Sequence, residues 1–199
     1  ILANKEDGIL FSGGSSVNTI SSNHISNNHQ DGIHLTGEAS SCTIEENIIS
    51  DNMRYGLYTS TDSNSISDNN ITRNLDYGVY LEGSSSSVFN NRFMFNNGSN
   101  LTYDPSSVQA FDGGSANSWY DLDEYGNYWW DWMEKYDPDK DDHDDAKVID
   151  EPYPVDGESG SEDLYPLYAD IEDHEIYELT IEIEKEGSTH PEEGWLLLV

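Results

Sequence analysis

The sequence predicts an all-β protein whose first part, residues 1–112, is a parallel β-helix. A glycine recurs at positions 8, 32, 56 and 78, so the chain repeats itself every 22–24 residues. Within each repeat, apolar residues such as Ile9 and Phe11 alternate with other residues, which is typical of short strands with one buried face. The many asparagines, serines and glycines disfavour helices. Repeats of this kind stack as coils around a shared core.

Each repeat contributes one residue to each of four predicted interior columns. The columns are Ile9, Ile33, Leu57 and Val79; Phe11, Leu35, Thr59 and Leu81; Ile20, Ile44, Ile66 and Val88; and Ile25, Ile49, Ile71 and Phe93. Asparagines 23, 47, 69 and 91 fall at one corner of successive coils, where stacked amides can hydrogen-bond to one another. The single cysteine, Cys42, excludes an internal disulfide and is expected to be a small buried side chain.

Four tyrosines occupy outward positions of the third and fourth coils: Tyr55, Tyr58, Tyr77 and Tyr80. They flank the repeat glycines, so they are predicted to gather on one outer face. One interpretation is a docking face, covered by the second part of the chain or by a neighbouring subunit. The other interpretation is a platform of rings that stacks on carbohydrate.

The charge of the chain is large and unevenly distributed. The formal net charge is −32 over 199 residues, with −9 in residues 1–112 and −23 in residues 113–199. This charge excludes direct binding to nucleic acid or to an anionic membrane surface. No apolar run approaches the roughly 20 residues of a membrane span, so no membrane insertion is expected. The shift in composition divides the chain into repeat coils at 1–112, an acidic aromatic segment at 113–168 and an end segment at 169–199.

The second part of the chain carries an ordered set of motifs. They are Gly-Asn-Tyr-Trp at 126–129, Asp-x-Asp-x-Asp at 137–141, Asp-x-Pro-Tyr-Pro at 150–154 and Tyr-Pro-Leu at 165–167. Together with the repeats, this set resembles NosD-type parallel β-helix proteins over roughly residues 4–168. The resemblance implies a right-handed β-helix exported from the cell, as in secreted and cell-surface proteins of archaea. It also implies a superfamily of carbohydrate-binding and sugar-hydrolase repeats.

The acidic stretch is a candidate calcium site. Hard cations prefer six to eight oxygen ligands, which alternating carboxylates on a short segment can supply. The expected ligands are Asp137, Asp139, Asp141 and Asp145, with Asp150 as a closing ligand. The segment is not an EF-hand, because Asp142 and Val148 stand where that motif has glycine and glutamate. A solvated acidic loop without an ion is the alternative. The six histidines are scattered, so a copper or zinc site has little support.

Three features complete the second part. The tryptophans at 129, 130 and 132 are expected to fasten the acidic aromatic segment onto the side of the β-helix. Residues 176–183 and 195–199 are predicted as terminal strands that cap the chain, form a hairpin or pair with another subunit. Sequons at Asn70, Asn97 and Asn100 are candidate N-glycosylation sites. The chain starts at Ile1 without methionine, and we expect it to be a piece of a longer protein.

Three functions are compatible with these features. The first is an extracellular structural or interaction protein, such as a surface-layer, sheath, filament or adhesin module, which self-associates or binds other surface proteins and is stabilised by Ca²⁺. The second is a carbohydrate-binding module that uses the tyrosines. The third is a polysaccharide lyase, epimerase or hydrolase. The enzyme ranks last, because none of the eight basic residues sits in an evident acid–base motif.

Overall fold

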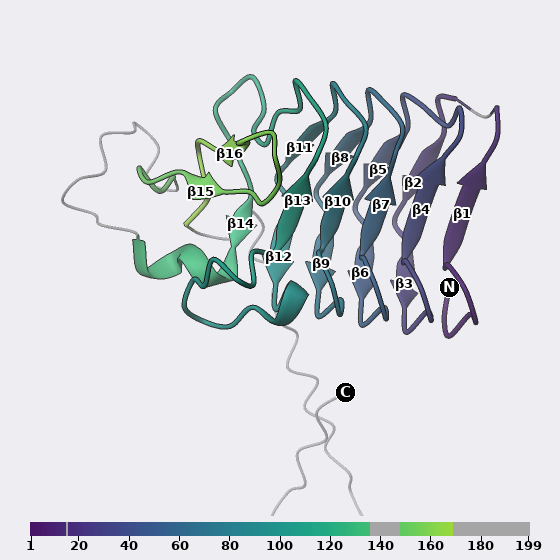
Figure 1. Cartoon of the computed structure of the whole chain (residues 1–199), viewed down its shortest axis with the longest axis horizontal. Coiled ribbons are helices and arrows are strands. Elements are labelled where there is room, and N and C mark those ends of the chain that lie inside the picture. The colour runs from purple at the N-terminus through teal and green to yellow at the C-terminus, as the bar shows by residue number, and fades with distance from the viewer. Residues whose placement is uncertain (15, 136–147, 169–199) are drawn as a thin grey trace, which may run out of the picture.

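The computed structural model describes residues 1–14, 16–135 and 148–168. It is a stack of coils in which three parallel sheets run along the coil axis (Figure 1). The first sheet contains β1 (Ile9–Ser12), β4 (Ile33–Thr36), β7 (Leu57–Thr59), β10 (Val79–Leu81) and β13 (Ala110–Asp112). The second contains β2 (Thr19–Ser21), β5 (Thr43–Glu45), β8 (Ser65–Ser67) and β11 (Ser87–Phe89). The third contains β3 (His24–Ser26), β6 (Ile48–Ser50), β9 (Asn70–Thr72), β12 (Arg92–Met94) and β14 (Tyr128–Trp129).

The strand register confirms the predicted parallel β-helix and all four interior columns. In the first sheet, Ile33 pairs with Ile9 and Leu57, and Val79 pairs with Leu57. The second and third sheets align their isoleucines in the same way. From the second coil onward these residues are buried, and they form one continuous core. Cys42 is buried, as expected.

Two ladders of side-chain amides connect the coils. In the predicted ladder, each Nδ2 donates to the Oδ1 of the next coil at 2.9–3.2 Å. That ladder runs through Asn23, Asn47, Asn69, Asn91 and Asn127. The second ladder has donor–acceptor distances of 2.8–3.3 Å. Its members are Asn4, Asn28, Asn52, Asn74, Asn96 and Gln109. Because the ladder amides are buried almost throughout, these bonds satisfy groups that would otherwise destabilise the fold.

The repeat glycines mark the points where coils approach most closely. A Cβ placed on Gly32 would lie 2.6 Å from the carbonyl oxygen of Gly56, and one on Gly8 would lie 2.6 Å from that of Gly32. The left-handed backbone at the coil corners falls elsewhere, on the residue before each ladder asparagine up to Asn96. Glu46 and Asp68, with φ of 55° and 58°, are examples. The glycines therefore repeat because the coils need space, and the turns do not depend on them.

The coil stack continues beyond residue 112 and is closed by the aromatic segment. Asn127 extends the first amide ladder, and Trp129 extends the column that contains Phe93. The Trp129 ring stacks on Phe93 at 4.3 Å and on Tyr153 at 3.9 Å between centroids. The tryptophan-rich segment therefore lies over the end of the stack, and the expectation that it packs against the side of the β-helix is wrong. The 3-10 helix η2 (Trp130–Lys135) and the hairpin of β15 (Tyr153–Pro154) and β16 (Glu162–Asp163) lie at this end (Figure 1).

Buried carboxylates, among them Asp163 and Asp131, hold the end of the stack together. Asp163 Oδ2 accepts hydrogen bonds from Trp129 Nε1 at 2.8 Å and from the Asn127 amide at 2.6 Å. Burial raises the pKa of Asp163 to about 7, although these N–H donors act in the opposite direction. Asp131 accepts a hydrogen bond from Gln109 Nε2 at 2.5 Å. Burial raises the pKa of Asp131 to about 6.

Each 3-10 helix of the described residues follows a strand of the third sheet. The 3-10 helix η1 (Asn96–Gly98) follows β12, and η2 precedes the segment at 136–147. Among the helices of the described residues, none has the length and apolar character needed to cross a membrane. The predicted terminal strands at 176–183 and 195–199 lie outside the described residues.

An Asn69→Ala substitution tests the first amide ladder. Asn69 Nδ2 donates to Asn91 Oδ1 and to two backbone carbonyls, and its Oδ1 accepts from Asn47. Each buried group left without a partner costs about 1–3 kcal/mol. The free energy of unfolding, measured by denaturant titration, should therefore fall by at least about 2 kcal/mol. Asn70→Ala is the matched control, because Asn70 Oδ1 accepts no hydrogen bond from the described residues. Equal losses in the two variants would contradict this role of the ladder.

An Asp163→Asn substitution tests the buried carboxylate at the end of the stack. The folded-state pKa of about 7 exceeds the unfolded value of 3.8, so the folded protein holds the proton more tightly. Asp163 therefore lowers the stability as the pH rises from about 4 to about 7. The melting temperature of the native protein should fall over this range, and it should fall less in the variant. An unchanged pH dependence in the variant would show that other groups cause the effect.

Candidate functional site

The outer side of the first sheet carries a continuous group of aromatic rings. Strand register places His34, Tyr58, Tyr80 and Phe111 in one outward column. The Tyr80 ring stacks on Phe111 with centroids 4.3 Å apart and an interplanar angle of 11°. The ring centroids of His34 and Tyr58 are 4.6 Å apart. Parallel, in-register strands thus convert a repeat in sequence into a row of rings on the surface.

A second column lies beside the first and contains the residues that precede the repeat glycines. Tyr55 stacks on Tyr80 with centroids 4.6 Å apart. Tyr77 lies 5.8 Å from Tyr80 and 5.6 Å from Phe111. We call the set Tyr55, Tyr58, Tyr77, Tyr80 and Phe111 the aromatic face. Its five rings form one connected group through pairwise ring contacts, so the predicted gathering of the four tyrosines is confirmed.

The aromatic face is only partly covered by the second part of the chain. Asp156 lies in a backbone bridge next to Phe111, and its carboxylate accepts a hydrogen bond from the Tyr77 hydroxyl at 2.5 Å. Burial together with Asp156 raises the pKa of Tyr77 well above its usual value. Each of the five aromatic residues nevertheless remains partly exposed among the described residues. The contact with the second part therefore borders the face at one edge and leaves the ring group accessible.

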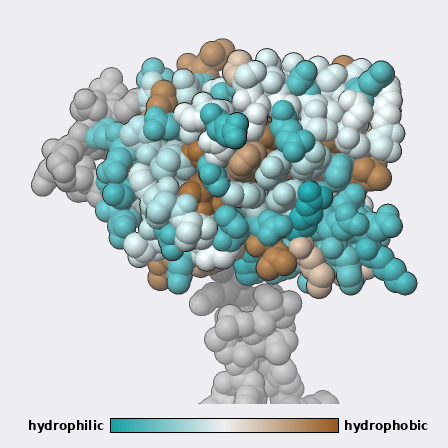
Figure 2. All heavy atoms as spheres, viewed as in Figure 1, coloured by the Kyte–Doolittle hydropathy of each residue, from teal (hydrophilic) through white to brown (hydrophobic). Residues whose placement is uncertain are grey.

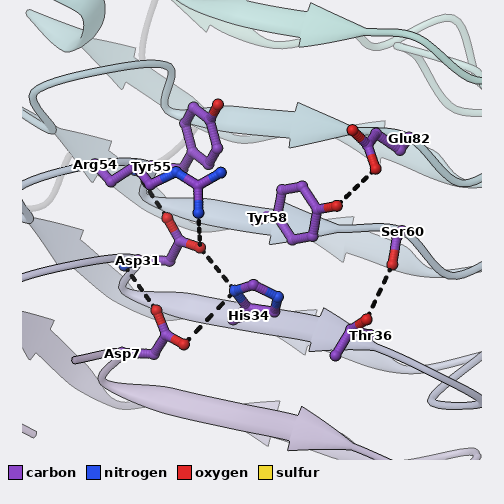
Figure 3. A network of polar contacts seen from close by, with 9 residues as sticks. All are labelled: Asp7, Asp31, His34, Thr36, Arg54, Tyr55, Tyr58, Ser60 and Glu82. Carbon is purple, nitrogen blue, oxygen red and sulfur yellow. Dashed lines mark hydrogen bonds and ion pairs between the residues drawn. The ribbon is translucent and has the colours of Figure 1, made fainter.

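A cluster of charged side chains lies beside the aromatic face, on the coils nearer the N-terminus (Figure 3). His34 Nδ1 is 2.8 Å from Asp31 Oδ2 and 3.6 Å from Asp7 Oδ2. The second oxygen of each carboxylate accepts a hydrogen bond from a backbone N–H of the following coil. Asp7 Oδ1 accepts from the Asp31 N–H at 3.0 Å, and Asp31 Oδ1 accepts from the Tyr55 N–H at 3.2 Å. The stacking of the coils therefore fixes both carboxylates, and both direct their Oδ2 atoms toward one imidazole.

Arg54 joins this cluster to the aromatic face. Its guanidinium Nη1 lies 3.5 Å from Asp31 Oδ2, and its Cζ lies 4.4 Å from the centroid of the Tyr55 ring, a cation–π distance. The side chain of Asp31 is fully buried, and burial raises its pKa while the charge of Arg54 lowers it. The face thus has a charged border on this side.

The opposite border is formed by Glu82. Its carboxylate accepts a hydrogen bond from the Tyr58 hydroxyl at 2.6 Å (Figure 3). Burial, with the nearby Glu82 charge, raises the pKa of Tyr58 to about 12. Tyr58 is therefore a hydrogen-bonding phenol at neutral pH. The side of the molecule in Figure 2 is mostly hydrophilic or intermediate in character, with hydrophobic residues in small separate groups.

The predicted calcium ligands mostly lie outside the described residues. Asp137, Asp139, Asp141 and Asp145 belong to the segment at 136–147, and the structure describes Asp150 as exposed. The prediction of a calcium site therefore stays a prediction.

The candidate glycosylation sites differ in accessibility. Asn100 is exposed, and Asn97 is partly buried with its Nδ2 donating to the Val108 carbonyl at 2.9 Å. Asn70 lies in β9, where its Oδ1 is buried. Of the three sequons, the one at Asn100 thus presents its amide most freely.

The polar border of the face was not predicted as a site. Asp7, Asp31 and His34 appear in the sequence at the outward positions of the first coils, and the repeat register is the signal that could have brought them together. At the positions of Arg54 and Glu82, other coils carry different residue types, such as Gln30 and Asp76 for the first and Thr36 and Ser60 for the second, so no repeat pattern singles them out.

Residues 1–118 match the family model for a right-handed β-helix region. The match covers more than half of the 199 residues, so the chain belongs to the right-handed β-helix family. Searches of curated proteins and of solved structures gave no significant match.

Proposed function

We propose that this right-handed β-helix is a non-catalytic module of an extracellular protein and that its aromatic face binds carbohydrate. The observation that carries the proposal is the connected group of five partly exposed rings, with hydrogen-bonding groups at its borders. Aromatic rings offer flat apolar surfaces to the C–H groups of sugars, and phenol hydroxyls add hydrogen bonds. Arg54 and Glu82 lie at opposite sides of the face and are placed to bind sugar hydroxyls.

The burial of the nearby carboxylates supports binding over hydrolysis. Glycoside hydrolysis requires two carboxyl groups that flank the scissile bond. The Asp31 side chain is 0% exposed and that of Asp7 is 11% exposed. Each also holds a backbone N–H through its Oδ1. A sugar on the aromatic face could not reach the Asp31 carboxylate, so this pair is better suited to shaping the face than to catalysis.

The extracellular setting rests on the sequence motifs. The similarity to NosD-type β-helix proteins of archaea implies export, and the exposed Asn100 is a suitable acceptor for a glycan in an exported protein. The net charge of −32 favours neutral sugars over acidic polysaccharides, because like charges repel at the surface.

Alanine substitution of Tyr58 or Tyr80 tests the proposed face. Each substitution removes a ring from the centre of the group, so affinity for a bound neutral glycan should fall about tenfold or more, equivalent to about 1.4 kcal/mol. A glycan array followed by calorimetry would measure the affinities. Tyr120→Ala is the matched control, because Tyr120 is partly buried and contacts Tyr165 at 5.0 Å away from the face. Unchanged binding in the face variants, or release of sugar products, would contradict the proposal.

A calcium-stabilised structural building block is the second candidate function. The observation that favours it is the apolar surface of the first coil, where Leu2, Leu10 and Val17 are 66%, 53% and 78% exposed. Exposed apolar groups at the end of a coil stack, next to unpaired strand edges, suit contact with another β-helix surface. The predicted ligands at 137–150 would supply the calcium site.

Electron microscopy and thermal melting test this second candidate. Calcium should raise the melting temperature, by binding only the folded protein, and a chelator should reverse the effect. Asp139→Asn should weaken the response, while Asp104→Asn, far from the acidic stretch in sequence, should leave it unchanged. The purified protein should form end-to-end assemblies. Isolated particles would contradict self-assembly, and equal melting with calcium and with chelator would contradict the calcium site.

A further inference from the structure

Three potential metal ligands converge beside the aromatic face. The ligand atoms of Asp7, Asp31 and His34 all lie within 4.8 Å of one another, and they form the one such group among residues 1–14, 16–135 and 148–168. His34 Nδ1 lies between the two carboxylates, at 2.8 Å from Asp31 Oδ2 and 3.6 Å from Asp7 Oδ2. Figure 3 shows the two aspartates directed at the imidazole from neighbouring coils.

These distances suit a small tetrahedral cation. Zn²⁺ binds imidazole nitrogen and carboxylate oxygen at about 2.0–2.2 Å, which places tetrahedral ligand atoms about 3.3 Å apart. The observed 2.8 Å and 3.6 Å fall on either side of that value. A modest rotation of the His34 ring, whose side chain is 20% exposed, would accommodate an ion between the three atoms. Imidazole also favours a transition metal over Ca²⁺, which prefers oxygen ligands.

The surroundings already hold the ligands as a metal site requires. Metal-binding carboxylates and imidazoles are normally oriented by outer hydrogen bonds. Here the Asp31 and Tyr55 backbone N–H groups fix the Oδ1 atoms of Asp7 and Asp31, so the Oδ2 atoms are presented inward. The Asp31 carboxylate is fully buried; its Oδ2 is 2.8 Å from His34 Nδ1, and its one guanidinium contact is a 3.5 Å approach by Arg54. Among the described residues, the one permanent positive charge beside this buried carboxylate is thus at a long contact distance, and a cation bound at Oδ2 would stabilise the carboxylate further.

We propose that Asp7, Asp31 and His34 bind a divalent transition-metal ion of the Zn²⁺ type. The ligands are Asp7 Oδ2, Asp31 Oδ2 and the deprotonated Nδ1 of His34, and water completes the coordination. Arg54 competes with the ion for Asp31 Oδ2 and moves away when the ion binds. The site does not depend on carbohydrate binding, because no residue of the aromatic face is a ligand.

Calorimetric titration with Zn²⁺ tests the site. The native protein should bind one Zn²⁺ ion tightly, and this binding should be distinct from the weaker binding of further ions by its 40 acidic residues. His34→Ala should lose at least about tenfold in affinity for that ion, since even loss of an outer hydrogen bond typically costs this much. His24→Ala is the matched control, because His24 is an exposed strand histidine of β3. Circular dichroism would verify that each variant is folded.

The Arg54→Gln variant tests whether the cluster binds a metal ion or only stabilises the fold. Removal of the competing charge should tighten Zn²⁺ binding, and the ion should raise the melting temperature of this variant more than that of the native protein. Weaker or unchanged binding would contradict ligation by Asp31. Absence of a tight site in the native protein, or equal affinity in His34→Ala and the native protein, would overturn the proposal.

Discussion

The fixed register between successive coils is the constraint on which the rest of the structure depends. Amide ladders such as Asn47–Asn69–Asn91 satisfy buried backbone and side-chain groups only when each coil lies directly over the previous one. The glycine contacts reinforce this, because Gly32 can lie against Gly56 only in that alignment. A shift by one residue would turn every core side chain outward, so polar and apolar interactions specify the same register.

The same register creates the surface on which the candidate functions rest. Outward residues of neighbouring coils lie at strand spacing, about 4.8 Å, which is also a favourable separation for stacked rings. Tyr58 and Tyr80 therefore contact each other as a direct result of their positions in the repeat. Asp7 and Asp31 approach each other for the same reason, and their mutual repulsion requires Arg54, His34 or an ion nearby. A rigid stack thus holds in place groups that would separate on a flexible surface.

The repetitive part of the fold follows from the sequence, and the departures from the repeat do not. The interior columns and the four tyrosines are periodic, so spacing alone brings them together. Phe111 pairs with Tyr80, 31 residues earlier in the chain, and Trp129 pairs with Phe93, 36 residues earlier. The regular spacing between paired residues is 22–24. Because these connections are longer than one repeat, the sequence spacing does not reveal which residues pair across them. Contacts between different columns, such as that of Arg54 with Asp31, depend on side-chain length and conformation, which the sequence repeat does not specify.

Native-state hydrogen exchange tests most directly whether the coil stack holds the candidate site rigid. The amides of Ile33 in β4 and Leu57 in β7 donate to the carbonyls of Gly56 and Gly78 in the next coil, at 3.0 and 2.8 Å. β7 carries Tyr58 of the aromatic face, and β4 carries His34 of the neighbouring cluster. If the coils form one cooperative unit, these amides exchange only through global unfolding, with the same free energy as core amides of β6 and β9. Exchange of the face strands through local opening at a clearly lower free energy would contradict the account.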